Sequence, residues 1–309
     1  DGNQIGCSQQ EWTHREDPRY PGSMDFDWVH NWELASGCIR DVLHETGVAP
    51  DEIAAVSTTC MREGILLYDQ DGNEIWACAN VDARSTDEVG RLISTNPELE
   101  KQLYQQSGQS YALNAIPRIL WVKDKMPEIY EKTAVVGMFN DWLIYKLTGV
   151  LAVEPSNGST TGLFDLQSRN WDPSIAQRCG LRGDIFPRVL ESGTVAGVVN
   201  ESGALQTGLA PGTPVVVGGG DCQLGTIGVG ASDPGPWCSE EASGSMSLIQ
   251  KAAEPTLMPV CASTAMQFQD CGSMKRWPLN PVLLCGGFAT ASASWRSRRG
   301  KGPAGTPMR

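Results

Sequence analysis

The sequence predicts an α/β fold in which short strands alternate with helices. β-Branched runs without polar alternation, such as residues 215–217, are typical of strands that are buried on both faces. Segments with helical spacing stop at glycines, as residues 27–47 do. The chain has 309 residues, of which 40% are hydrophobic and 19% are charged, so it is long enough to bury a large core.

The first part of the chain is expected to contain two extended regions on either side of one long helix. Residues 1–3 have the composition of a hairpin turn, so residues 5–12 are predicted as a strand whose partner would precede residue 1. We therefore expect the chain to be truncated at its N-terminus. The other elements predicted here are a helix at 27–47, a strand at 53–59 and hairpin strands at 65–68 and 74–79, which are joined by a turn at 69–72.

Helices dominate the middle of the chain, and strands return later. One helix is predicted to follow residues 80–84 and to run to about residue 93. Further helices are predicted at 98–107, 116–125, 127–132, 140–147, 171–178 and 203–208, with a strand at 135–138. Residues 151–153 and 162–166, with the polar turn 156–160 between them, are predicted to form another hairpin. The mixture indicates an α/β domain without internal repeats.

Charge and cysteine content exclude several classes of partner. Residues 1–235 carry twice as many acidic as basic side chains, which argues against nucleic acid, whereas residues 236–309 carry twice as many basic as acidic ones. No apolar run reaches membrane-spanning length and no leader peptide opens the chain, so we expect no membrane partner. The ten cysteines form no C-x-x-C pair and lie mostly far from the three histidines, so we expect reduced thiols, no metal site and a cytoplasmic protein.

The stretch 214–230, PVVVGGGDCQLGTIGVG, is the centre of the functional interpretation. A buried strand runs into three glycines and then Asp221, with a helix predicted to follow. A carboxylate at the end of a buried strand, beside glycines that let a ligand approach the backbone, suits a catalytic base. The alternative is a helix cap after a glycine-rich turn, because such a turn alone is a weak signal.

A second charged motif lies between two predicted strands. Arg62 and Glu63 occupy the MREG turn, where adjacent opposite charges suit a pocket that donates hydrogen bonds to, and accepts them from, the hydroxyls of a polar ligand. The alternative is an exposed, solvated ion pair at a strand end.

Four segments together resemble one family. They are MREG at 61–64, NDWLIYKLTG at 140–149, EPSNGSTTGLFDLQSRNW at 154–171 and VVGGGDCQLG at 216–225. These motifs are similar to those of the FGGY carbohydrate kinases, and the resemblance covers residues 1–235 nearly continuously. It implies an actin-like, ribonuclease-H-like N-terminal domain that binds a small-molecule substrate.

The resemblance also implies a reaction. It is the phosphorylation of a small polyhydroxylated carbonyl compound by ATP with Mg²⁺, and the best-fitting acceptor is the primary hydroxyl of linear 4,5-dihydroxypentane-2,3-dione. Asp221 matches the position of the family's base, and Arg62 and Glu63 match the pair that holds substrate hydroxyls. Phosphoryl transfer has a loose transition state, so an oriented, ionised aspartate suffices and no histidine is needed.

Other residues and other substrates fit the same resemblance. Gln223 is close enough in sequence to Asp221 to help orient the substrate. Asp82 and Arg84 match a charged motif beside the pocket, and a structural role is the alternative for both. A xylulose-type ketose kinase of the same family is an alternative activity, and a non-catalytic, ligand-binding fragment is another.

The resemblance ends near residue 235. We expect residues 1–235 to be the substrate-binding domain without its first strands, the ATP-binding domain to be absent, and this chain to lack activity. The segment 236–245, PWCSEEASGS, is compatible with VVLGGSFWQ in a shifted reading frame, so we interpret residues 236–309 as an aberrant, disordered tail from out-of-frame translation. A genuine basic tail that binds an acidic partner is the alternative.

Overall fold

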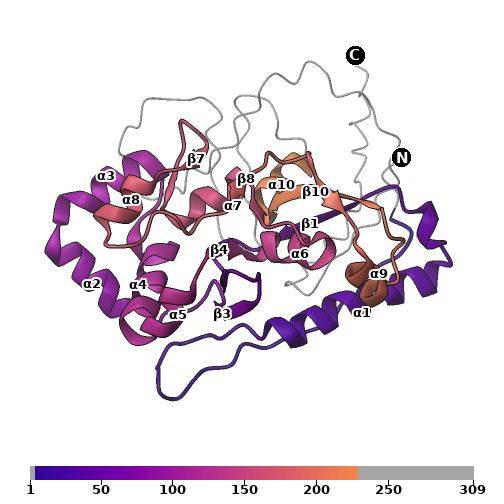
Figure 1. Cartoon of the computed structure of the whole chain (residues 1–309), viewed down its shortest axis with the longest axis horizontal. Helices are drawn as coiled ribbons and strands as arrows, with labels where there is room; N and C mark the ends of the chain where they lie inside the picture. The colour runs from indigo at the N-terminus through magenta and orange to yellow at the C-terminus, as the bar shows by residue number, and fades with distance from the viewer. Residues whose placement is uncertain (1–3, 229–309) are drawn as a thin grey trace, which may run out of the picture.

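The computed structural model describes residues 4–228, which form small sheets surrounded by helices (Figure 1). The helices are α1 Trp28–Thr46, α2 Thr86–Thr95, α3 Pro97–Ser107, α4 Ala115–Lys125, α5 Pro127–Lys132, α6 Phe139–Thr148, α7 Pro155–Gly158, α8 Pro173–Arg178, α9 Glu201–Thr207 and α10 Asp221–Gly228, with 3-10 turns at Pro50–Glu52, Tyr111–Leu113 and Ser159–Thr161. The strands are β1 Val56–Cys60, β2 Ile65–Tyr68, β3 Glu74–Cys78, β4 Val135–Met138, β5 Ala152–Val153, β6 Phe164–Asp165, β7 Asn170–Trp171, β8 Arg188–Val189, β9 Val195–Val198 and β10 Pro214–Gly220.

The sheet that bears the glycine-rich motif has the order β1-β10-β9. β10 pairs in parallel with β1 and antiparallel with β9, so the last strand of the described chain lies in the middle of this sheet. The side chains of Val215 and Val217 are buried but that of Val216 is only half-buried, so burial of the run on both faces is confirmed only in part. The carboxyl ends of β1 and β10 meet at one edge, and the chain leaves both strands there.

A second sheet, β3-β2-β4, separates two hydrophobic cores. β2 is buried along its whole length because both of its faces are covered. Ile65 and Leu67 pack into the core that includes α4, whereas Leu66 and Tyr68 pack into the core that includes α1 and α6. The chain passes from the first sheet to the second through the turn that follows Cys60.

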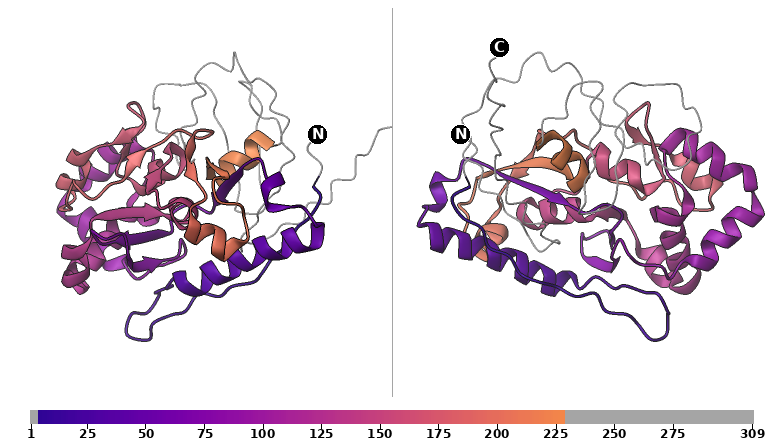
Figure 2. Two further views of the ribbon diagram at one scale, coloured as in Figure 1. Left: turned by 45° about the vertical axis from the view of Figure 1, so that its right-hand side comes forward. Right: turned by 180° about the vertical axis from the view of Figure 1, so that it is seen from behind.

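The long helix α1 forms as its end residues dictate. The Asp27 side chain accepts a hydrogen bond from the backbone N–H of His30 at 3.0 Å, and Gly47 ends the helix with φ of 66°. The predicted strand at residues 5–12 is wrong, because this segment runs beside α1 instead of joining a sheet (Figure 2). Gly6 lies against Thr46, and the Ser8 hydroxyl donates to Asp41 at 3.3 Å.

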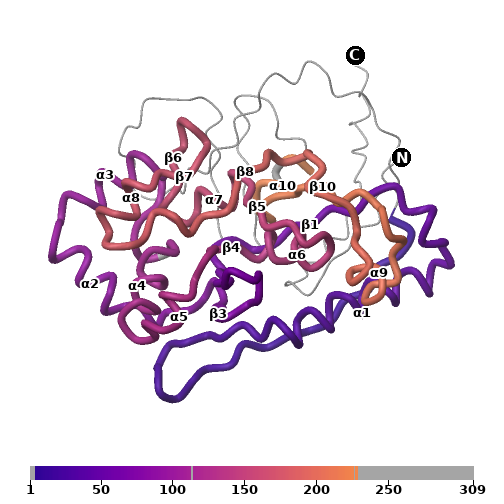
Figure 3. The backbone as a smooth tube through the Cα atoms, viewed as in Figure 1, coloured from indigo at the N-terminus to yellow at the C-terminus, as the bar shows by residue number. Residues whose placement is uncertain are grey.

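The predicted hairpin between residues 151 and 166 is also wrong. β5 pairs in parallel with β8, and β6 pairs with β7, so the two apolar runs have different partners (Figure 3). The segment between them, which was predicted as a turn, forms α7 and a 3-10 turn. Glu154 accounts for this difference, because its side chain caps α7 by accepting from the backbone N–H groups of Ser156 and Asn157.

The other predicted elements are confirmed within one to three residues at their ends. These include the hairpin of β2 and β3, strand β4, and helix α6, which stops at Gly149 with φ of 76°. The predictions for residues 1–3 and 236–309 lie outside the described residues. Within residues 4–228, no helix combines the length and the apolar character that a membrane span requires.

Candidate active site

Asp221 is the first residue of α10 and follows directly from the last glycine of β10. Its side chain is exposed, and its Oδ1 accepts a hydrogen bond from the backbone N–H of Cys222 at 2.8 Å. Strand β10 and the helix therefore present the carboxylate at the carboxyl edge of the sheet, where ligands bind in open α/β sheets.

A β-bulge sets the path of β10 as it approaches Asp221. Ser57 pairs with Val216 and Thr59 with Gly219, so three steps along β10 face two steps along β1. Only glycine fits at the extra position, because a Cβ on Gly218 would lie 1.8 Å from the Thr58 carbonyl oxygen. Beyond the bulge, the Thr59 hydroxyl donates to the Gly219 carbonyl at 2.9 Å and holds the end of the strand.

The Arg62–Glu63 turn lies at the same edge as Asp221. Cys60, the last residue of β1, is the register partner of Gly220, the last residue of β10. A Cβ placed on Gly220 would lie 3.4 Å from the Cγ of Arg62, so the Arg62 side chain packs against this end of β10. The structure therefore brings the two sequence motifs together, although about 160 residues separate the strands that carry them.

Opposing charges act on the Glu63 carboxylate. Burial raises the pKa of Glu63 above its usual value, and the negative charge of Asp221 raises it further, whereas the charges of Arg62 and Arg118 lower it. Two carboxylates and a guanidinium thus lie close enough to influence one another at the end of the sheet. Such a set both donates and accepts hydrogen bonds, as a polyol ligand requires.

Gln223 is buried beside this region, with only 1% of its surface exposed. Among the described residues, neither atom of its amide has a hydrogen-bond partner, and the same holds for Nη1 of Arg62. A Cβ placed on Gly220 would lie 2.5 Å from the Gln223 Oε1, so the Gln223 amide lies against the end of β10. Buried polar atoms without partners are costly, and those of Gln223 and Arg62 are available to a polar ligand.

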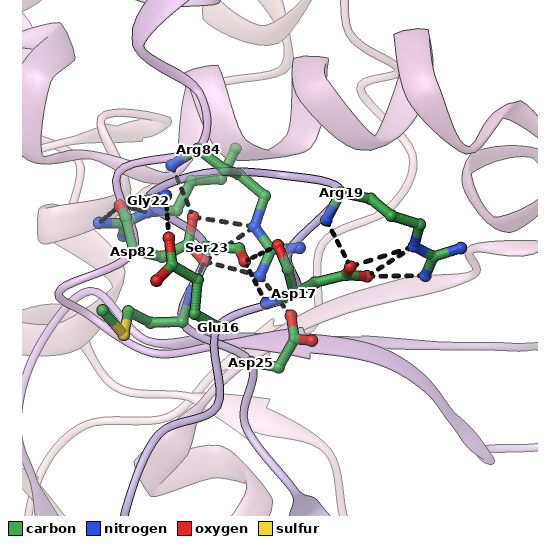
Figure 4. A network of polar contacts seen from close by, with 10 residues as sticks. Glu16, Asp17, Arg19, Gly22, Ser23, Asp25, Asp82 and Arg84 are labelled. Atoms are coloured by element: carbon green, nitrogen blue, oxygen red, sulfur yellow. Dashed lines mark hydrogen bonds and ion pairs between the residues drawn. The ribbon is translucent and has the colours of Figure 1, made fainter.

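Asp82 and Arg84 lie in a network that ties the loop after β3 to the loop before α1 (Figure 4). The buried Asp82 carboxylate accepts from the backbone N–H of Met24 at 2.6 Å and from Nε of Arg84 at 2.8 Å. Arg84 also pairs with Asp25. These bonds join segments that are about 60 residues apart in the chain.

The Arg84 guanidinium is further held by aromatic rings. Its Cζ lies 5.0 Å from the ring centroid of Trp121 and 5.3 Å from that of Trp76. These contacts anchor Arg84 to Asp82, Asp25 and the two tryptophans, and they support the structural role for both members of the motif.

Two residues near the site were missed by the sequence analysis. Glu154 is fully buried, and its carboxylate accepts from the Ser156 hydroxyl at 2.7 Å, while that hydroxyl accepts from the backbone N–H of Gly220 at 2.9 Å. Arg118, on α4, donates to the Glu63 carbonyl at 2.5 Å. The EPSNG motif was a signal for the first, whereas nothing in the sequence around Arg118 distinguished it from an ordinary helix residue.

The cavities beneath α1 are of a different kind. One of about 30 Å³ is lined mostly by apolar side chains such as Trp32, Ile39 and Leu147, and another of about 10 Å³ includes Val42 and Leu209. They are far below the roughly 300 Å³ of a typical ligand pocket, so they are packing gaps. Among residues 4–228, no three metal-ligating side chains gather into a cluster.

Residues 2–228 match the N-terminal domain of the FGGY family of carbohydrate kinases. The chain belongs to this family. An FGGY relative from Escherichia coli strain ATCC 8739, autoinducer-2 kinase, is 52% identical over 235 residues, which is 76% of this chain and 44% of the relative. The autoinducer-2 kinase of Yersinia enterocolitica is 49% identical over the same shares of both chains.

Solved structures show the same FGGY fold. The xylulose kinase of Rhodospirillum rubrum superposes with a TM-score of 0.66 at 22% identity, covering 72% of this chain and 46% of that one. The glycerol kinase of Plasmodium falciparum with ADP gives a TM-score of 0.63 at 21% identity, covering 72% and 45%. These comparisons confirm the predicted family and fold, and they show that the chain spans less than half the length of its relatives.

Proposed function

We propose that residues 1–235 form the substrate-binding domain of an ATP-dependent kinase for a small polyhydroxylated carbonyl compound. The observation that carries this proposal is the meeting of Asp221 with the Arg62–Glu63 turn at the ends of two neighbouring parallel strands. The autoinducer-2 kinases that are about half identical to the chain favour linear 4,5-dihydroxypentane-2,3-dione, the precursor form of autoinducer-2, as the substrate.

The proposed mechanism assigns one task to each group. The primary hydroxyl oxygen of the dione attacks the γ-phosphorus of ATP, a new P–O bond forms, the bond to the β-phosphate oxygen breaks, and ADP leaves. Asp221 accepts the hydroxyl proton, and it does so late because the transition state is loose. Arg62 donates to a substrate oxygen, Glu63 accepts from a vicinal hydroxyl, and the Gln223 amide orients the chain of the substrate.

ATP, as its Mg²⁺ complex, is the co-substrate in this proposal, and we assign its binding to a second domain of the kind that the longer relatives have room for. A chain without that domain binds the dione and does not phosphorylate it. We also propose that residues 236–309 are out-of-frame translation. Sequencing the coding DNA around codon 236 tests this, and a single intact frame in independent reads would end the idea.

Binding to the chain itself tests the proposed function. The dione, xylulose and glycerol are each titrated into the protein while the melting temperature and the heat of binding are followed. Binding of the dione at 100 times its Kd should stabilise the fold by about 2.7 kcal/mol. Glu63→Gln should weaken this binding about tenfold, because the amide donates where the carboxylate accepts.

The outcomes separate the candidate functions. Preference for xylulose over the dione would favour a ketose kinase, and binding of neither would refute the proposal. Phosphorylation of the dione with ATP is measured in parallel against an Asp221→Asn control. Turnover well above that control would show that residues 1–309 are active by themselves and would contradict the assignment of nucleotide binding to a second domain.

A further inference from the structure

Arg118 is a buried arginine whose hydrogen bonds join two loops at the candidate site. Only 3% of its surface is exposed. Its Nη1 donates to the Glu63 carbonyl at 2.5 Å, and its Nη2 donates to the carbonyls of Asn80 at 2.7 Å and Asp82 at 3.2 Å. One guanidinium thus connects the MREG turn after β1 to the loop after β3.

The shape of the guanidinium matters for this connection. Its Nε also points toward the Asp82 carbonyl, at 3.4 Å, so all three nitrogens face backbone oxygens. A planar fork with fixed donor directions can hold several acceptors at set distances, whereas the single ammonium group of lysine cannot. The bonds depend on this shape as well as on the charge.

The backbone at Glu63 needs support from outside the turn. Its φ is 73°, in the left-handed region, which is unfavourable for a residue with a side chain. Arg118 holds the carbonyl of this residue, and Gly64 is packed so tightly against Phe139 that a Cβ would lie 2.4 Å from the ring. The turn is therefore held from two sides in the conformation that places Glu63 near Asp221.

We propose that Arg118 is a positioning residue of the substrate site. It holds the Arg62–Glu63 turn and the Asn80–Asp82 loop in one arrangement, so that the Glu63 carboxylate stays within electrostatic range of Asp221, where it can accept from a ligand hydroxyl. This inference rests on the proposed function for its ligand, but its effect on Glu63 exists without any ligand.

The charges that face Glu63 supply a readout that simple destabilisation would not change. These groups are Arg62, Arg118 and Asp221, and the two arginines favour the ionised carboxylate. Replacing Arg118 by a neutral residue should raise the pKa of Glu63. Replacing it by lysine should keep the charge and lose the fork.

The experiment compares three variants of the full chain with the wild type. Arg118→Gln removes the charge, and Arg118→Lys keeps it. Lys123→Gln is the matched control, because it removes one positive charge from the same helix and one hydrogen bond to a backbone carbonyl, that of Gly180 at 2.6 Å. Each protein is melted to confirm folding, the Glu63 carboxyl is titrated by ¹³C NMR with Glu63→Gln to assign its signal, and dione affinity is measured by calorimetry.

The expected results are distinct for each variant. Arg118→Gln shifts the Glu63 titration to higher pH and weakens dione binding at least tenfold. Arg118→Lys leaves the titration close to that of the wild type and still weakens binding about tenfold, which is the loss of one charge-assisted hydrogen bond. Lys123→Gln changes neither quantity.

Two results would overturn the inference. One is wild-type dione affinity in a folded Arg118→Lys protein, a result that decides the question even if Arg118→Gln fails to fold. The other is an unshifted Glu63 titration in a folded Arg118→Gln protein. Failure of the wild type to bind the dione refutes the proposed function instead. The Glu63 titration then decides alone whether Arg118 controls the turn.

Discussion

Gly218→Ala should destabilise the protein strongly, because the bulge in β10 has no room for a side chain. The new Cβ would lie 1.8 Å from the Thr58 carbonyl oxygen and 2.9 Å from its carbon. Both atoms belong to the backbone of the paired strand, so no side chain can turn away to relieve the contact. The strands would have to separate by about 1.2 Å to reach the 3.0 Å below which Cβ contacts are essentially never seen.

The magnitude follows from what this separation breaks. A shift of that size stretches the neighbouring hydrogen bonds of the β1–β10 ladder beyond bonding distance, and two such bonds contribute about 2 kcal/mol. Overpacking adds about 1–3 kcal/mol, and the reduced freedom of the unfolded chain offsets about 0.4–1 kcal/mol. We expect a net loss of about 3 kcal/mol in the free energy of unfolding.

Urea unfolding followed by tryptophan fluorescence measures this loss. With an m value of about 3 kcal/mol per molar, the midpoint should fall by about 1 M. Gly219→Ala is the control, since its Cβ would lie 3.1 Å from the Ser156 hydroxyl oxygen, a contact that a few tenths of an ångström relieve, and it should cost less than about 1 kcal/mol. Equal midpoints for the two variants would refute the reasoning.

Three further predictions concern buried groups. Burial raises the pKa of Asp141, so the native state keeps a proton that the unfolded state releases, and this group's contribution to stability is lost as pH rises. Asp141→Asn should therefore flatten the decline of the urea midpoint as pH rises above about 4, the usual aspartate pKa, and an unchanged slope would contradict this. Arg84→Met leaves the buried Asp82 carboxylate without its guanidinium and should cost about 3–5 kcal/mol in urea unfolding, so a loss below about 1 kcal/mol would argue against the network. Gly64→Ala places a Cβ 2.4 Å from the Phe139 ring and should cost about 1–3 kcal/mol and weaken dione binding in calorimetry, which wild-type affinity would disprove.

Elements that depend on local chemistry could be predicted from the sequence. Asp27 and Gly47 bound α1 by capping, and the apolar β2 and β3 flank a turn that joins them directly. The segment at residues 5–12 was predicted as a strand only from the turn-like composition of residues 1–3. Such a turn does not show whether the chain after it joins a sheet or packs along a helix. The partner of β5 is β8, which lies more than 30 residues further on, and no local signal indicates that pairing.

The site shows the same division. Asp221, Arg62 and Glu63 could be predicted because each stands in a motif that marks the end of a strand. Arg118 donates to the carbonyls of Glu63 and of the loop after β3, and such contacts between distant segments exist only after the chain has folded. Nothing in the sequence around Arg118 marks that role, whereas Glu154 caps α7 within its own EPSNG motif and is in principle a local signal.

The central position of β10 has a consequence for how the protein is made. β1 must wait for a partner that the ribosome adds about 160 residues later, so its edge stays open through most of synthesis. Until β10 is made, β1 and β9 have no common neighbour, and the two halves of the candidate site belong to separate parts of the nascent chain. We expect folding to be slow and to complete the sheet and the site in a single late step.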